Sequence, residues 1–147
     1  MPLKSSTGLR NYMLDAGSLK AALADGLIKI YAGTNPATAD AALGAATLLC
    51  TISDNATGGG IEFEVNAVDG AIAKNASETW KGVNANSGTA TFFRHVAPGD
   101  DGTASTTQRR LQGTVGTSGA DLNLSSIILV AGADQLISFY NASLPTF

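Results

Sequence analysis

The stretch Ser87–Ser126, SGTATFFRHVAPGDDGTASTTQRRLQGTVGTSGADLNLSS, indicates the fold class of the whole chain. Residues 89–97 are rich in the β-branched and aromatic side chains typical of a strand, and a concentrated turn signal follows at 98–102. Residues 107–115 return as a second strand, so the pair predicts a long hairpin. A second Gly-rich turn leads to the apolar run at 127–130, which predicts a third strand and hence a three-stranded meander.

Further short strands are predicted on both sides of this hairpin, at residues 27–32, 48–53, 61–65, 70–74, 79–83 and 135–144. In the third of these, strict alternation places Ile61, Phe63 and Val65 on a core face and two glutamates on a solvent face. About eight or nine short strands separated by Gly-rich turns predict an all-β fold. We expect an antiparallel β-sandwich, and the long connections favour a jelly roll.

One region near the amino terminus has helical character. Residues 5–25 carry apolar residues at helical spacing, and either Ser6 or Thr7 is placed to cap the first turn. A chain of 147 residues is the size of one domain. We therefore expect a helical arm over 1–26 and a β-sandwich over 27–147 within a single domain. The arm would lie across an open end of the sandwich or reach onto a neighbouring subunit, and the sequence does not separate these two arrangements.

The composition restricts the classes of partner. Only 14% of the residues are charged and the net charge is -3, against about 25% charged residues in a typical soluble domain. The nine basic residues are scattered, whereas a nucleic-acid surface requires clustered Lys and Arg. The many Ser, Thr and Gly residues suit either a surface packed against other subunits or a weakly charged monomer. We expect no nucleic-acid partner.

No targeting or membrane segment is evident. The amino terminus MPLKSSTG has no apolar core of a signal peptide, and no apolar run approaches the ~18 residues of a membrane-spanning helix. The sequence therefore predicts synthesis in a cytoplasm, no membrane partner, and export only as part of an assembly.

The residues that most often hold metals or perform catalysis do not form a recognisable motif. His95 is the only histidine, and the single Cys50 cannot form an internal disulfide or a cysteine-based zinc site. The acidic turn at 100–102 lacks the ligand spacing of a calcium loop. We expect a structural or surface role for His95, a buried apolar role for Cys50, and no metal or cofactor.

Two other groups of side chains have a functional interpretation beside a structural one. Glu62 and Glu64 share one face of a strand, as a glycosidase pair would, but alternation alone explains them as the wet face of that strand. Trp80 with Tyr31 and Tyr140 would form a sugar-binding platform if exposed, although core packing is the ordinary role of such aromatics. No catalytic residue is assigned, and we do not expect an enzyme.

Five segments of the chain, in the same order, carry a resemblance to a known family: STGLRNYMLDAGSLKAAL, IKIYAGTNPATAD, LLCTIS, SGTATFFRHVAPGDDG and LQGTVGTSGADLNLSS. They resemble small virion proteins of tailed, short-tailed-type bacteriophages, which are encoded near the major capsid protein and act as capsid decoration or cement proteins. The likeness covers most of the chain, and its motifs are structural rather than catalytic.

This resemblance implies a jelly-roll β-sandwich that forms homodimers or homotrimers and binds the outer surface of the major capsid protein lattice. The protein would be made in the cytoplasm of the bacterial host and then reside on the capsid surface of the virion, where it stabilises the head. The family has no catalytic residues to transfer to this chain. The side chains that we expect at capsid or subunit contacts lie in the arm and in the 98–106 loop: Leu3, Leu9, Tyr12, Pro98, Asp100 and Asp101.

Two alternatives stay open at this point. A phage tail or head–tail connector component would share the β fold and the oligomeric habit but occur in few copies per particle. A carbohydrate-binding or adhesion module is the alternative from another class, and its only support is the set of aromatics around Trp80.

Overall fold

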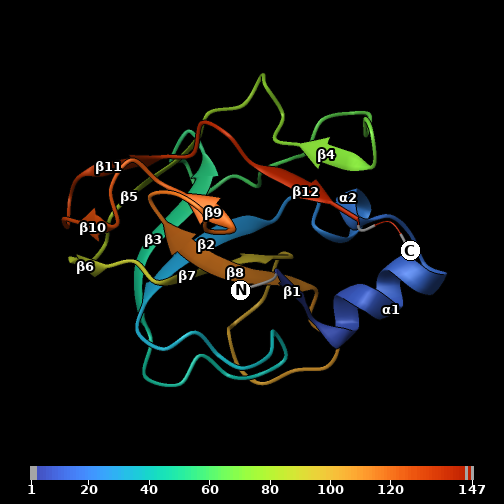
Figure 1. The fold of residues 1–147 in the computed structure, drawn as a ribbon, viewed down its shortest axis with the longest axis horizontal. Coiled ribbons are helices and arrows are strands. Elements are labelled where there is room, and N and C mark those ends of the chain that lie inside the picture. The colour runs from blue at the N-terminus through green and yellow to red at the C-terminus, as the bar shows by residue number, and fades with distance from the viewer. Residues whose placement is uncertain (1–2, 145, 147) are drawn as a thin grey trace.

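The computed structural model describes residues 3–144 and 146, and Figure 1 shows that this part of the chain is mostly β. Two short helices, α1 (Thr7–Asp15) and α2 (Leu19–Ala22), lie near the amino terminus. The strands are β1 (Lys4–Ser5), β2 (Leu27–Ala32), β3 (Thr47–Asp54), β4 (Ala71–Ala73), β5 (Trp80–Val83), β6 (Gly88–Thr89), β7 (Phe92–Val96), β8 (Arg110–Gly116), β9 (Leu122–Asn123), β10 (Ile128–Leu129), β11 (Asp134–Leu136) and β12 (Asn141–Ser143).

The main sheet runs in the order β1-β8-β7-β2-β3-β5-β11, and all of these neighbours are antiparallel. The short strand β9 adds to β8 in parallel, and β10–β6 and β12–β4 form separate two-stranded ladders. The expected all-β, antiparallel, sandwich-like class is confirmed. The jelly roll is not confirmed, because one long strand path with two small ladders takes the place of two four-stranded sheets.

The predicted hairpin is present, but the predicted meander is wrong. Strands β7 and β8 pair antiparallel with Phe93 opposite Gly113 and Val96 opposite Arg110. The third strand, β10, pairs with β6 and not with β8. The far edge of β8 is instead occupied by β1 and β9, because the carboxylate of Asp121 accepts hydrogen bonds from the main-chain N–H and the hydroxyl of Thr114 and folds the 117–123 segment back onto β8.

Two strands were predicted with the wrong extent. Over 61–65 the chain makes only isolated bridges, and although Ile61 and Phe63 are buried, Val65 is 75% exposed rather than in the core. The predicted terminal strand over 135–144 is divided into β11 and β12, which pair with β5 and β4 respectively. Because of this division, the end of the chain contributes one strand to the main sheet and one to the separate β12–β4 ladder.

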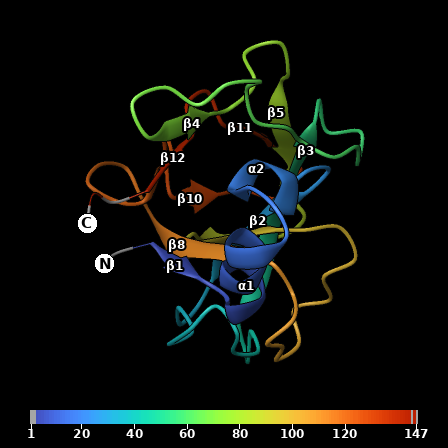
Figure 2. The same ribbon diagram turned by 90° about the vertical axis from the view of Figure 1, so that its right-hand side faces the viewer.

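The core lies between the main sheet and a cover made of the helices and the small ladders. Figure 2 shows α1 and α2 in front of β2 and β8. Leu9, Ala22 and Leu23 of the helical region belong to the same apolar cluster as the strand residues. Full burial of a large apolar side chain stabilises by about 1.5–3 kcal/mol, so the helices contribute to the stability of the β domain.

The amino-terminal arm is anchored on the chain's own sheet. β1 pairs with β8, and the hydroxyl of Ser6 caps α1 by accepting from Leu9 N while donating to the carbonyl of Gln108. Thr7 donates its N–H and hydroxyl to the carboxylate of Asp40, over 2.8 and 2.6 Å. Contacts about a hundred residues apart in the sequence therefore fix the arm, which in this structure lies on its own subunit.

Candidate functional site

Within residues 3–144 and 146, no group of three or more His, Cys, Asp or Glu side chains is placed to hold a metal ion. His95 is buried, and its Nδ1 lies 3.2 Å from the hydroxyl of Tyr140. Burial lowers the pKa of His95 to about 3, so the ring is neutral at pH 7. Cys50 is fully buried, and burial raises the pKa of its thiol to about 11. Both residues have the surroundings of structural rather than reactive groups.

The two glutamates of residues 61–65 hold loops in place. Glu62 accepts a hydrogen bond from the main-chain N–H of Asp25 at 2.9 Å, and Glu64 accepts one from Ala76 N at 2.6 Å. Each carboxylate thus satisfies a main-chain donor on a different loop. The arrangement gives each of the two carboxylates a structural role.

The three aromatic residues that would form a sugar-binding platform are core residues. Trp80, Tyr31 and Tyr140 are 1%, 4% and 5% exposed, and they form no platform on the surface. The indole N–H of Trp80 donates to Glu78, and the ring of Tyr31 stacks on Phe92 with centroids 5.0 Å apart. The feature that suggested a carbohydrate-binding module is therefore absent from the surface.

The most elaborate polar structure is an arginine clamp, which we define as Arg94, Arg110 and Gln112 of the β7–β8 hairpin. Arg110 donates to both carboxylate oxygens of Asp100, and the two side chains are 0% and 1% exposed. The same guanidinium donates to the carbonyls of Ala39 at 3.1 Å and Thr103 at 2.7 Å. One buried cation therefore fixes two loops against the sheet.

The other two members of the clamp complete the network. Gln112 donates to the carbonyl of Pro36 at 2.7 Å and accepts from Arg94 Nε at 2.8 Å. Arg94 also donates to the carbonyl of Ala41 at 2.6 Å. Burial, together with the nearby charge of Arg110, lowers the pKa of Arg94 below its usual value. These bonds order loops 33–46 and 98–107 against the sheet, and Arg94 Nη1 is the one buried nitrogen of the clamp left without a hydrogen-bond partner in the described part of the chain.

Of the six side chains expected at contacts, four keep surface exposure: Leu3, Tyr12, Pro98 and Asp101. For the other two, the expected surface position is wrong, because the structure buries both side chains. Leu9 is fully buried beneath α1, and the carboxylate of Asp100 is enclosed by the arginine clamp. Leu9 joins α1 to the core, and Asp100 joins the 98–107 loop to Arg110. Tyr12 is partly buried, with the guanidinium of Arg109 lying 4.7 Å from its ring centroid.

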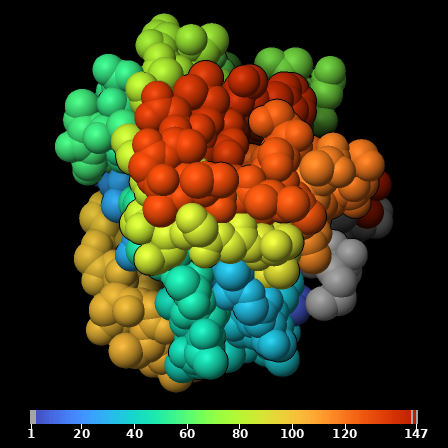
Figure 3. Space-filling model, turned by 90° about the vertical axis from the view of Figure 1, so that its left-hand side faces the viewer, coloured from blue at the N-terminus to red at the C-terminus, as the bar shows by residue number. Residues whose placement is uncertain are grey.

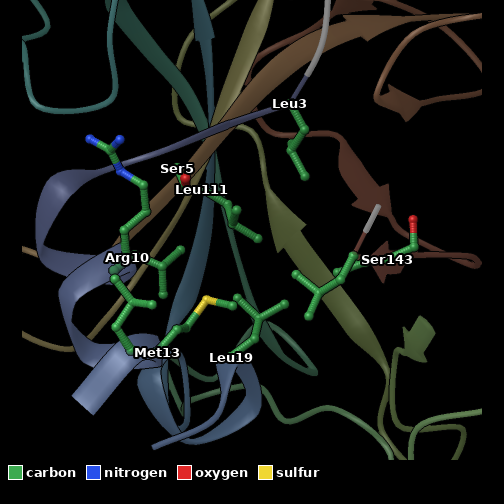
Figure 4. Close-up of a pocket in the computed structure, with 11 residues that line it drawn as sticks. Leu3, Ser5, Arg10, Met13, Leu19, Leu111 and Ser143 are labelled. Carbon is green, nitrogen blue, oxygen red and sulfur yellow. The ribbon is translucent and has the colours of Figure 1, made fainter. Parts of the chain in front are cut away.

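Two apolar surfaces are not covered by any other part of the chain within residues 3–144 and 146. The first is a groove of about 530 Å³ beside α1 and the end of β12, shown in Figure 4, where Met13, Leu19 and Leu111 lie around it. Leu14, at its lining, is 85% exposed. Most of the side chains that line the groove are aliphatic, and its polar lining residues are Arg10 and two serines.

The second surface, which we call the apolar face, consists of Val83, Ile128, Val130, Leu136 and Phe139. These five side chains are between 50% and 76% exposed. Figure 3 shows this side of the molecule, where the yellow segment through β6 lies against the orange and red segments through β10 and β11. Contiguous exposed apolar side chains of this kind mark interaction sites more often than isolated ones do. The signal in the sequence is the apolar run at 127–130, which predicts a strand but does not tell which of its side chains are exposed.

No helix in the described part of the chain has the length and apolar character needed to cross a membrane. Comparison of the chain with protein-family models, with curated proteins and with solved structures found no match.

Proposed function

We propose that this chain is a non-enzymatic structural protein of a bacteriophage virion, a capsid decoration or cement protein. It binds the outer surface of the major capsid protein lattice and stabilises the head. The observation that carries the proposal is the pair of separate apolar surfaces, the groove beside α1 and the apolar face, on one weakly charged β domain. The resemblance of the five sequence segments to such virion proteins supports it.

A decoration protein needs two kinds of contact. One joins the subunit to its own copies, and the other joins it to the capsid protein. Many moderate contacts that close in parallel around a symmetric shell give a retention much stronger than any single contact. Two distant apolar surfaces and only 14% charged residues suit this role, because few charges lose their hydration when both surfaces are covered.

The buried polar residues fit a structural role as well. In the clamp, and in the bonds of Glu62 and Glu64, ionisable side chains orient main-chain groups of loops. Rigid loops reduce the conformational entropy lost when a surface is covered by a partner. A subunit whose loops are already ordered is suited to assembly at many equivalent positions.

The deciding experiment counts copies of the chain per particle. Virions of the phage that encodes it are purified by gradient sedimentation, and the ratio of the chain to the major capsid protein is read by quantitative mass spectrometry. Hundreds of copies per particle are expected. A handful of copies would move the assignment to a tail or head–tail connector component, and no copies would remove the virion proposal.

A variant of the groove sharpens this test. Leu14→Asp places a charge at an 85% exposed position of the groove, and we expect it to reduce binding of the added protein to heads that lack it. Val68→Asp changes a 68% exposed valine outside both apolar surfaces and serves as the control. Equal head binding by both variants would exclude the groove from the capsid contact.

A further inference from the structure

We propose that the apolar face is the surface through which copies of this chain associate, so that its occupant is the same face of a second copy. The inference deepens the proposed function, on which it rests for its biological meaning, because it assigns one of the two apolar surfaces to self-association. The groove beside α1 is then the surface left for the capsid lattice.

Strand pairing makes part of this face rigid. In the β5–β11 ladder Val83 lies opposite Asp134 and Leu136 lies opposite Lys81. The residues between them, Gly82 and Gln135, are buried, so the four others share the outer side of the ladder. The exposed apolar side chains at this ladder are therefore presented by a paired sheet and not by a free loop.

The segment through β10 adds the next part of the face. Leu129 is 3% exposed and points into the core, whereas Ile128 and Val130 on either side of it are 68% and 59% exposed. The side-chain amide of Asn84 donates to the carbonyl of Val130 at 3.1 Å, which ties this segment to the end of β5. The apolar face thus forms one continuous fixed surface across β5, β10 and β11.

The distribution of charge is the observation that favours a second copy as the partner. Residues 82–93 and 122–144, which build this side of the molecule, contain a single charged residue, Asp134. Its carboxylate pairs with Lys81 at 3.1 Å, so the face itself is close to neutral although the chain carries a net charge of -3. Two copies that meet here bring no unpaired like charges together, whereas a partner selected by charge would find no complement.

A neutral apolar surface is self-complementary in the sense that a symmetric interface requires, since the same patch is used on both sides. The charge depletion and the exposed Phe139 match the composition of interface centres. Asp121, which lines a hollow together with Leu136 and Phe139, accepts hydrogen bonds from Thr114. Association by side-chain packing is favoured over extension of the sheet, because the carbonyl of Leu136 in the edge strand already accepts from the amide of Gln135.

The test uses the purified full chain without phage particles and measures its mass by size-exclusion chromatography with light scattering over a range of concentrations. The wild type is expected at twice the subunit mass of 14.9 kDa, because a contact of one face with the same face of a second copy gives a dimer. Val130→Asp, which places a charge inside the contact, is expected to weaken association on the order of 30-fold or more. Val65→Asp is the matched control, because Val65 is an exposed valine (75%, against 59% for Val130) outside the face, and it is expected to behave as wild type.

Circular dichroism verifies that each variant is folded, and Phe139→Ser replaces Val130→Asp if the latter does not fold. A wild type that stays at 14.9 kDa at high concentration would overturn the inference, as would an oligomer that tolerates both changes in the face. These outcomes are independent of the proposed function: a monomer that binds heads removes only the self-association, and an oligomer absent from virions removes only the capsid role.

Discussion

The arginine clamp buries charged side chains, whereas the apolar face exposes apolar ones. In the clamp, beneath loops 33–46 and 98–107, charged side chains are fully buried and every one is hydrogen-bonded within the chain. In the apolar face, across β5, β10 and β11, large apolar side chains are exposed and charges are nearly absent. Figure 1 shows the loops below the sheet and the strands of the apolar face at its upper left.

The difference separates residues that stabilise the subunit from residues that await a partner. Buried ionic groups are costly to desolvate, and they are tolerated where each one satisfies several main-chain groups. Exposed apolar groups contribute little to the stability of a monomer, so their gathering on one side of the molecule points to association. Substitutions in the two regions are therefore expected to differ in size and in kind.

The largest effect is expected from the centre of the clamp. Arg110→Met leaves the carboxylate of Asp100 buried without its partner, together with the carbonyls of Ala39 and Thr103. Loss of one partner of such a pair costs about 3–5 kcal/mol in the free energy of unfolding, measured by urea denaturation. Arg109→Met is the matched control, because Arg109 is partly exposed over the ring of Tyr12, and its loss is expected to cost no more than about 1 kcal/mol.

A double variant distinguishes pairing from packing at this position. Adding Asp100→Leu to Arg110→Met removes the unpaired charge and is expected to recover part of the lost stability. If the double variant is as unstable as the sum of its two single variants, the loop carbonyls and not the ion pair dominate the clamp.

The next effect depends on pH and concerns the buried His95. Burial lowers its pKa from 6.5 to about 3 in the folded chain, whereas the unfolded chain keeps the ordinary value. Between these two values the unfolded state binds more protons, so stability is full above pH 6.5 and falls as the pH is lowered towards 3. We expect a loss of about 2 kcal/mol in the free energy of unfolding between pH 7.5 and pH 5.

Urea denaturation at the two pH values measures this loss, and His95→Gln provides the control. The variant cannot take up the proton, so it is expected to keep the same stability at pH 7.5 and pH 5 apart from its own packing defect. A wild type without any pH dependence in this window would mean that His95 is accessible to water in the folded chain.

A smaller effect is expected where loop 33–46 meets α1. Asp40→Ala removes the acceptor of the Thr7 N–H and hydroxyl, and a cost of about 1–2 kcal/mol is expected. Burial acts to raise the pKa of Asp40, but the two bonds from Thr7 outweigh it and lower the pKa. The contribution is therefore present at neutral pH and lost as the pH falls through the lowered pKa. Asp101→Ala is the control, since Asp101 is exposed and bonds only within its own turn, to Thr103.

Local signals in the sequence were sufficient for much of the fold. The strand at 27–32, the turn at 98–102 and the hairpin that encloses it follow from side-chain type and turn chemistry, which act over a few residues. The meander failed because the choice of partner for residues 128–129 depends on which edge of β8 is free. Such pairing is decided between segments far apart in the chain and has no local signal.

The candidate site was predictable only in part for the same reason. Nothing in the sequence marks Arg94 and Arg110 as buried, because burial of a guanidinium depends on distant loops. Here those loops contribute the carbonyls of residues 39, 41 and 103. Leu9 and Asp100 were assigned to the surface, yet each lies beneath it. The exposed aliphatic residues of the apolar face are of the same types, Val, Ile and Leu, as the residues of the core. Only the fold therefore distinguishes the two roles.

The smallest effect is expected from Ile128 of the apolar face, and the buried Leu129 beside it provides the contrast. Leu129 is 3% exposed and Ile128 is 68% exposed in the same strand. Leu129→Ala is expected to cost about 2–5 kcal/mol, whereas Ile128→Ala is expected to change the free energy of unfolding by no more than about 0.5 kcal/mol.

The protein concentration decides how this last pair of variants is interpreted. When copies associate through the apolar face, binding of a second folded copy stabilises the folded state by mass action, so Ile128→Ala loses stability only at concentrations where the wild type is an oligomer. Leu129→Ala loses the same amount at every concentration at which the variant remains monomeric. Unfolding at a low and a high concentration thus separates a core residue from an interface residue. A loss for Ile128→Ala that equals that of Leu129→Ala at low concentration would place the apolar face within the subunit's own core.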